Sequence, residues 1–321
     1  MWIVAGGLQL QPFMFTKGFS EDVLGTAATS QPEPLGAAIR LGERVVAAHP
    51  GGWNWAFALI ELAIGAGMLF GGRGRLAALS CLGCLGWGAG IWLVGEGAGG
   101  MLTGHAALST GAPGAALLYV ALTIAAWPSG AGAEPEPPPS RRMLAGTWLG
   151  VWLIGAVLAA LPAQWGASKL SAQSAMGWMM SPSWAAGPSL ALTRWLGSLP
   201  TLAAEVLSGC VVAIYVMVAL AVRHFGAARQ VLILAGAALA LAMWMFGQGF
   251  GGVSTGTATD VGTGPLIVIL ALALLVEHKP AAVSRNQHAV DTIANSVLSG
   301  TETVSVGQNA PVTDVASGID R

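Results

Sequence analysis

The sequence predicts an all-α integral membrane protein built from two tandem four-helix units. Hydrophobic residues make up 54% of the 321 residues and charged residues only 9%, and the mean hydropathy is +0.67. Soluble domains carry about 25% charged residues, so a chain this poor in charge could not cover a water-facing surface. Several apolar stretches approach the length of a membrane span, and one Gly-rich segment occurs twice.

The repeated segment sets the expected architecture. Residues 92–113 read WLVGEGAGGMLTGHAALSTGAP, and residues 244–265 read WMFGQGFGGVSTGTATDVGTGP. We align the two copies at a constant offset of 152 residues, without a gap. Each copy joins two apolar segments, which indicates one unit at 1–132 and a second at 143–278. A Pro-rich linker is expected at 133–142 and a disordered polar tail at 279–321.

Eight transmembrane helices, four in each unit, are expected to cross the bilayer. A helix needs about 20 apolar residues to do so. The first segment, residues 1–15, is shorter, but residues 2–12 have the spacing of residues 152–162. This spacing predicts a truncated first helix whose native start lies upstream, with a short re-entrant or interfacial segment as the alternative. The other spans are expected at 56–70, 76–94, 114–127, 144–161, 202–222, 231–246 and 265–276.

The basic residues predict how these helices are oriented. Nine of the 14 Lys and Arg residues fall in one set of connections and in the tail, which the positive-inside rule places in the cytoplasm. Four spans per unit make the two units parallel, with both termini cytoplasmic. The loops at 16–53 and 164–201 then lie outside, and their apolar periodicity predicts short helices on the outer membrane surface.

Acidic residues in the spans are the first candidates for a functional site, because a charge inside a bilayer is costly. Glu61 and Glu205 each lie in the second helix of a unit, four residues before a glycine. They are either proton or cation sites that face a central cavity or structural carboxylates, protonated or paired within their own unit. Glu96, at the outer end of the third helix, completes the set expected to handle protons.

The two copies of the repeated loop differ in their polar residues. Glu96 corresponds to Gln248 in the second copy, and Leu108 corresponds to Asp260. This difference would suit one working site and one degenerate site, and it would equally suit drift in solvent-exposed loops.

The glycines and threonines of the repeated loop are candidates for substrate binding. Backbone amides beside a helix N-terminus favour an anion, and Pro113 and Pro265 are expected in the first turn of the following helices. Alternatively, the glycines only allow the helices to pack closely around a turn. The candidates are Gly99, Gly100, Thr103, Gly104, Gly251, Gly252, Thr255 and Gly256.

Other kinds of chemistry find little support. A net charge of −1 and the lack of a binding motif argue against nucleic acid. Cys81 and Cys84 stand about one turn apart in an apolar helix, which favours packing over a redox pair or a metal site. Met176, Met179 and Met180 would suit Cu(I), but packing is again the preferred interpretation. We therefore predict no metal site and no evident cofactor, with a quinone as the possible exception.

Several short motifs resemble the DoxX/DoxD family of four-helix membrane proteins. They are ELAIGAGMLF with Glu61, EVLSG with Glu205, GASKL with Lys169, and the turn GGRGRLAAL at 71–79. The resemblance implies a bacterial plasma-membrane protein. It implies a subunit of thiosulfate:quinone oxidoreductase, as in DoxD-like members, or a membrane partner of thiol or oxidative-stress enzymes. It also adds Lys169 to the expected substrate-binding residues.

Three functions follow as hypotheses. The first is a quinone-linked oxidoreductase subunit in which the outer loops hold a thiosulfate or thiol reductant and Glu61, Glu96 and Glu205 handle protons. The second is a non-catalytic scaffold or accessory subunit, which would require a membrane or periplasmic redox partner besides the lipid bilayer. The third is a transporter for a small solute, because repeats and intramembrane acids are common in transporters.

Overall fold

The computed structural model describes residues 1–72, 74–127 and 141–276. All regular elements in these ranges are helices, which confirms the all-α class. Both predicted units lie within one compact body, Met1–Val276. Arg73, the expected linker up to residue 140 and the expected tail at 279–321 lie outside the described residues.

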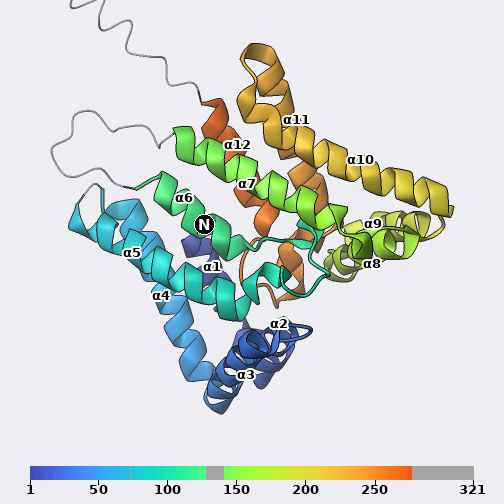
Figure 1. The fold of residues 1–321 in the computed structure, drawn as a ribbon. Helices are drawn as coiled ribbons and strands as arrows, with labels where there is room; N and C mark the ends of the chain where they lie inside the picture. The colour runs from blue at the N-terminus through green and yellow to red at the C-terminus, as the bar shows by residue number, and fades with distance from the viewer. Residues whose placement is uncertain (73, 128–140, 277–321) are drawn as a thin grey trace, which may run out of the picture. The chain divides into compact units, whose positions relative to one another are not determined.

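Five helices are long and apolar enough to cross a membrane, which confirms the membrane class (Figure 1). Each carries almost no charge along its length, as a lipid environment requires. They are α4 (Pro50–Phe70), α5 (Arg75–Gly90) continued by η3 (Ile91–Gly95), α7 (Arg141–Ala160), α10 (Thr201–Ala219) continued by η7 (Leu220–Arg223), and α11 (Gly226–Phe246).

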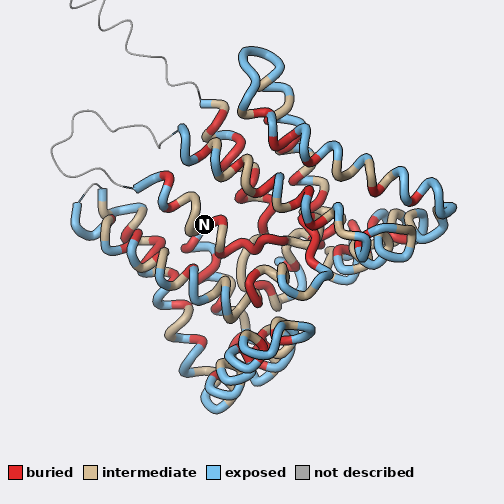
Figure 2. The backbone as a smooth tube through the Cα atoms, in the orientation of Figure 1, coloured by how far each residue is buried: buried red, intermediate tan, exposed pale blue. Residues whose placement is uncertain are grey.

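The other three expected spans are short helices. α1 (Trp2–Leu8) has 7 residues, α6 (Ala115–Ala125) has 11 and α12 (Thr263–Leu275) has 13. At 1.5 Å per residue, α6 measures about 16 Å, roughly half of the hydrocarbon thickness. The structure therefore shows five helices of spanning length, and the prediction that these three short segments also cross the membrane is not confirmed. Figure 2 shows that burial is concentrated in the centre of the fold, whereas the outer faces of the long helices are exposed.

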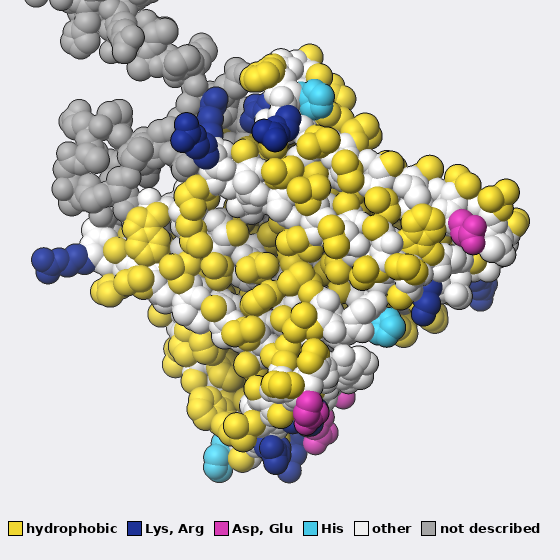
Figure 3. Space-filling view, viewed as in Figure 1, with side chains coloured by type: hydrophobic (Ala, Val, Ile, Leu, Met, Phe, Trp, Pro, Cys, Tyr) yellow, Lys and Arg dark blue, Asp and Glu magenta, His cyan; other side chains and the backbone are white. Residues whose placement is uncertain are grey.

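Surface helices occupy the two long loops, as the periodicity predicted. In the first half they are η1 (Pro12–Phe15), η2 (Phe19–Leu24), α2 (Gly25–Ala27) and α3 (Glu33–Ala48). Ile39 and Val46 of α3 are buried, while Leu41 on its other face is exposed. In the second half, η6 (Pro162–Gln164) precedes α8 (Ala167–Met180) and α9 (Ser183–Gly197), which pack against each other. Figure 3 shows hydrophobic side chains over most of one face, with charged side chains gathered at its edges.

The two Gly-rich loops have closely similar conformations. The first contains η4 (Ala98–Gly100) and η5 (Leu108–Thr110), and the second contains η8 (Gly249–Thr255). Gly99 and Gly251 have φ angles of 62° and 66°, and a Cβ atom on either would collide with the backbone at Pro113 or Val261. In both loops a threonine hydroxyl donates to a glycine carbonyl three residues earlier, at 2.7 Å. Positive φ and close backbone approach explain why glycine stands at these two positions.

The constant offset between the two loops is wrong beyond Leu108. Trp92 Nε1 donates to the carbonyl of Pro113, whereas Trp244 Nε1 donates to the carbonyl of Val261. The helices that follow begin at Ala115 and Thr263, so the first loop is four residues longer at 109–112. Consequently Pro113 lies before the N-cap of α6, and Pro265 alone lies in the first turn of its helix.

Each Gly-rich loop crosses to the other half of the molecule. Gln11, which follows α1, donates to the carbonyl of Ala258 in the second loop at 3.1 Å. Gln164 of η6 donates to the carbonyl of Ala106 in the first loop at 3.2 Å. Ala106 and Ala258 are matching positions of the repeat, so the exchange is reciprocal. It brings side chains of the second loop into the first half, where the candidate site lies.

Candidate functional site

A cavity of about 330 Å³ lies in the first half, between α1, η2, α3, α4 and the α5–η3 helix. Its size falls at the lower end of the range for small-molecule sites. Six aromatic side chains supply much of its wall: Trp2, Phe19, Trp53, Phe57, Trp87 and Tyr119. The tip of the second Gly-rich loop, at Thr259 and Asp260, closes one side, so both halves of the chain build the cavity.

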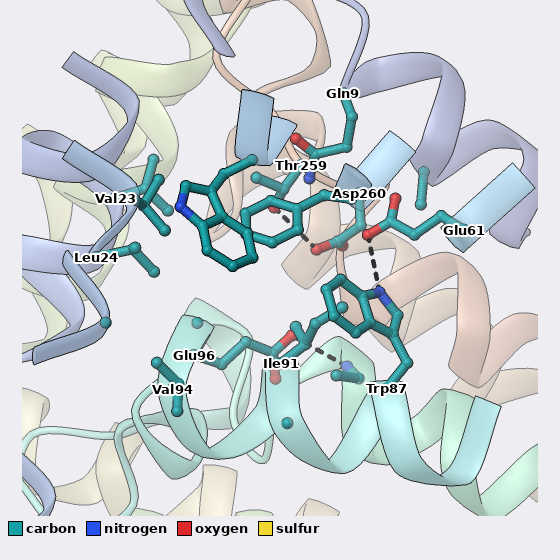
Figure 4. A pocket seen from close by; sticks show the side chains of 18 of the residues that line it. Gln9, Val23, Leu24, Glu61, Trp87, Ile91, Val94, Glu96, Thr259 and Asp260 are labelled. Carbon is teal, nitrogen blue, oxygen red and sulfur yellow. Dashed lines mark hydrogen bonds between the residues drawn. The ribbon is translucent and has the colours of Figure 1, made fainter. Parts of the chain in front are cut away.

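Three carboxyl groups point into this cavity (Figure 4). Glu61, in the middle of α4, is only 2% exposed and accepts a hydrogen bond from Trp87 Nε1 at 3.4 Å. Glu96 follows η3 and accepts one from the backbone N–H of Ala116 at 3.0 Å. Asp260 accepts one from the N–H of Gly262 at 2.5 Å and another from the Thr259 hydroxyl at 3.4 Å.

Several residues that line the cavity have a buried polar atom without a hydrogen-bond partner among the described residues. These atoms are Gln9 Oε1, Glu61 Oε2, Glu96 Oε2 and Tyr119 Oη. Buried polar atoms are nearly always paired, and leaving one unpaired costs about 1–3 kcal/mol. Gln9 Oε1 is an acceptor only, and the two carboxyl oxygens are acceptors whenever their groups are ionised, so these side chains suit a guest that brings hydrogen-bond donors.

The acidic charge of the cavity is not balanced by a basic side chain. No Lys, Arg or His lines it, and the ion pair found in the described part of the chain, Arg40–Glu33, lies on the surface. Burial raises the pKa of Glu96 to about 8, with a further contribution from the Asp260 carboxylate. Burial also raises the pKa of Asp260. Burial therefore favours the protonated form of Glu96 near neutral pH.

The N-terminus of α6 is occupied by the chain itself. The Glu96 carboxylate lies against the first residues of that helix, where the helix dipole and free N–H groups favour negative charge. In the second half, the Gln248 amide makes the equivalent contact with the N–H of Thr263 at 3.1 Å. Because Glu96 already takes the position that a bound anion would need, the geometry here does not favour an external anion.

The structure separates the residues that the sequence grouped into one site. Glu61 and Glu96 line the same cavity, but Glu205 lies in the second turn of α10 and is exposed. Lys169 is exposed on α8. None of the eight glycines and threonines proposed for substrate binding lines the cavity. They shape the loops that carry Glu96 and Asp260, and a direct role for them in binding stays a prediction.

The matching region of the second half is almost filled. A cavity of only about 20 Å³ remains there, lined by Leu108, Gln164, Ser208 and Tyr215 among others. Leu108 of the first loop stands where Asp260 stands in the first half, and it packs on Gly155. Tyr215 of α10 donates to Met243 of α11, much as Glu61 of α4 accepts from Trp87 of α5.

Asp260, Gln9, Tyr119 and the aromatic wall were not among the site residues predicted from sequence. For Asp260 a signal existed, because it replaces Leu108 of the first loop in an otherwise conservative repeat. Glu96 and Asp260 both line the cavity, so the description of these positions as solvent-exposed is wrong, whereas one working site beside a degenerate one stays a prediction. Gln9 and Tyr119 carried no comparable signal.

Comparison with protein-family models, with curated protein sequences and with solved structures finds no match. The resemblance to the DoxX/DoxD family therefore stays a prediction from short motifs. The fold and the cavity define an all-α membrane protein with an acidic, aromatic-walled site.

Proposed function

We propose that this chain carries a small solute across a bacterial plasma membrane in exchange for protons, with the acidic cavity as its binding site. The observation that carries the proposal is the convergence of Glu61, Glu96 and Asp260, from both halves, on one cavity without a basic partner among the described residues. Charge in such a place must be neutralised by protons or by a cationic group of the guest. Competition between the two would couple solute binding to proton release.

In this proposal the chain has eight spans in two parallel units, with both termini in the cytoplasm. Three of the spans are the short helices α1, α6 and α12, and two of these, α1 and α6, contribute residues to the cavity wall. Broken or short helices at the junction of two repeats are a common way to build a transport site. The outer helices η2 and α3 cover the cavity, so access from outside would require them to move.

The test is proton movement in sealed proteoliposomes loaded with a pH-sensitive dye. Solutes are added by class: amines, carboxylates, sugars and thiosulfate. We expect at least one class to drive a proton flux that falls by about tenfold or more in Glu61→Gln, since this removes a carboxyl from the cavity. The matched control is Glu205→Gln, the same change at an exposed position, which should keep the flux of the unaltered protein.

A flux that survives in Glu61→Gln, Glu96→Gln and Asp260→Asn alike would contradict the proposal. So would the lack of a flux with every class of solute, provided that the reconstituted protein is monodisperse and correctly inserted.

A second candidate function is quinone-linked oxidation of a sulfur compound or thiol. The observation that favours it is the flat aromatic wall beside carboxyl groups that hold protons, because quinone reduction needs proton donors near an apolar ring. Purified protein would then reduce a soluble quinone with thiosulfate or a small thiol as donor. Activity in this assay without a proton flux would replace the transporter proposal. Inactivity in both assays would favour an accessory subunit, and co-purification would identify its partner.

A further inference from the structure

Among the possible guests of the cavity, the distribution of unpaired atoms points to one chemical class. This inference rests on the same site as the proposed function and names its ligand. We propose that the cavity binds a monovalent organic cation: a primary or secondary ammonium group attached to a small aromatic or aliphatic body.

The ammonium group is indicated by the acceptors that the fold leaves unpaired. Glu61 Oε2 and Gln9 Oε1 belong to side chains only 2% and 4% exposed, and both line the cavity. Glu96 and Tyr119 line the same cavity, and each also has one buried oxygen without a partner among the described residues. An ammonium offers two or three N–H donors and a positive charge, so it suits a cavity lined by carboxyl groups and unpaired acceptors better than an anion, a sugar or a hydrocarbon does.

The apolar body is indicated by the walls. Trp2, Phe57 and Trp87 present aromatic surface next to the carboxyl groups. Aromatic faces attract a cation, and they also bury the hydrocarbon part of the guest. A bare metal ion would lack this apolar contact. Moreover, no group of three His, Cys, Asp or Glu side chains in the described ranges is close enough to hold one.

Proton release should accompany binding. The titratable groups that line the cavity are Glu61, Glu96, Asp260 and Tyr119, and none of them is basic. A cation entering the site favours the ionised form of the carboxyl groups, which then lose protons to solvent. The guest is thus exchanged for protons at the same atoms.

Calorimetry with phenethylammonium, run on the detergent-solubilised full chain in two buffers of different ionisation enthalpy, tests the ligand class. Two compounds of nearly the same shape serve as controls: uncharged 2-phenylethanol and anionic phenylacetate. We expect the cation to bind about tenfold or more tightly than either control, because only the cation pairs with the carboxyls. The apparent enthalpy should depend on the buffer, which reports proton release. Equal or tighter binding of the alcohol or the carboxylate would overturn the inference.

Variants of the cavity carboxyl groups test whether phenethylammonium binds in the cavity. Glu61→Gln and Glu96→Gln should each weaken phenethylammonium by about tenfold and reduce the proton release, while Glu205→Gln should leave both unchanged. Each variant is first compared with the unaltered protein by size-exclusion profile and melting temperature, so that a folding defect is recognised. Wild-type affinity in both Glu61→Gln and Glu96→Gln would overturn the inference.

The ammonium has two sources, a free amine or the headgroup of phosphatidylethanolamine. Repeating the titration in nanodiscs with and without this lipid distinguishes them. Competition by the lipid supports the ammonium chemistry with a lipid source, and undiminished binding supports it with a soluble amine.

The result also separates this inference from the proposed function. Tight binding of the cation without proton flux in proteoliposomes would keep the ligand class and reject transport. Proton-coupled flux of an anionic or neutral solute, without binding of the cation, would do the reverse.

Discussion

The two halves of the molecule contain nearly the same Gly-rich loop, but one half has a cavity and the other is almost filled. In the first half, Glu61 and Asp260 face a cavity of about 330 Å³. In the second half, Leu108 matches Asp260 in the repeat, and Leu108 and Tyr215 line a cavity of only about 20 Å³. The Gly-rich loops have closely similar conformations over their glycines, but the side chains at Leu108 and Asp260 differ. The comparison teaches that loop geometry serves the fold, whereas the polar residues placed on it decide which half has a site.

The largest effect is expected from making the first half resemble the second. Asp260→Leu copies Leu108 into the cavity, and it should reduce ligand-driven proton flux by about tenfold or more because it removes both charge and space. Asp260→Asn keeps the shape but removes the charge. A similar loss of proton flux in both variants would show that the charge matters, and a loss in Asp260→Leu alone would show that the space matters. Full flux in both would show that the loop tip is not part of the site.

The reverse exchange should damage the fold. Leu108 is 1% exposed and packs on Gly155, so Leu108→Asp buries a carboxylate without a basic partner. We expect a loss of about 3–5 kcal/mol in the free energy of unfolding, or a protein that does not stay monodisperse. Leu102→Asp in the same loop is the control, because Leu102 is 58% exposed. Melting in detergent measures both, and equal stability of the two variants would contradict the filled second half.

Replacing different glycines of the loops by alanine should destabilise the protein to different extents. Gly99 and Gly104 both have positive φ, but a Cβ atom on Gly99 would collide with the Pro113 carbonyl, whereas one on Gly104 would meet open space. Gly104→Ala should cost about 1–2 kcal/mol from the backbone alone, and Gly99→Ala should cost clearly more. The same contrast is expected for Gly251 and Gly256. Unfolding experiments on the four variants check this, and equal costs would refute the close approach of the backbone.

The smallest expected effect is a dependence of stability on pH that arises in the first half. The pKa of Glu96 is raised from 4.5 to about 8 in the folded protein, so between these values the folded state binds more protons than the unfolded state. The free energy of unfolding should therefore fall as pH rises through this window and level off above it. We expect a decrease of several degrees in melting temperature from pH 5 to 9 that is smaller in Glu96→Gln. Gln248→Glu should steepen it, because it places a carboxyl at the matching position of the second half. An identical pH profile in Glu96→Gln would contradict the proton assignment.

Part of the fold and of the candidate site could be predicted from the sequence, because these features depend on local properties of the chain. Hydropathy identifies the five long helices, since an apolar run of that length has few stable alternatives to a membrane span. The Gly-rich repeat predicts two similar loops, because positive φ and close packing impose the same glycines twice. Glu61 and Glu96 stood out as candidates since charge in or near a span is costly.

Two differences between the sequence-based expectation and the structure share one cause, which is that the position of a residue in the sequence does not report its depth in the fold. Glu61 and Glu205 lie in corresponding helices, but Glu61 is central in α4 and buried, whereas Glu205 is near the start of α10 and exposed. The ungapped alignment of the loops is wrong for a similar reason. The first loop has four additional residues at 109–112, and only the folded chain shows which residues of the two loops are equivalent.

By itself, the sequence determined that this protein is helical, belongs to the membrane class and is organised around a repeated glycine loop. Those properties follow from composition and backbone sterics, which act locally. The tertiary structure alone decided that the loops cross between the halves, that Asp260 joins Glu61 and Glu96, and that one half keeps a cavity while the other fills it. Convergence of residues about 200 positions apart depends on how helices pack, and packing is a property of the whole chain.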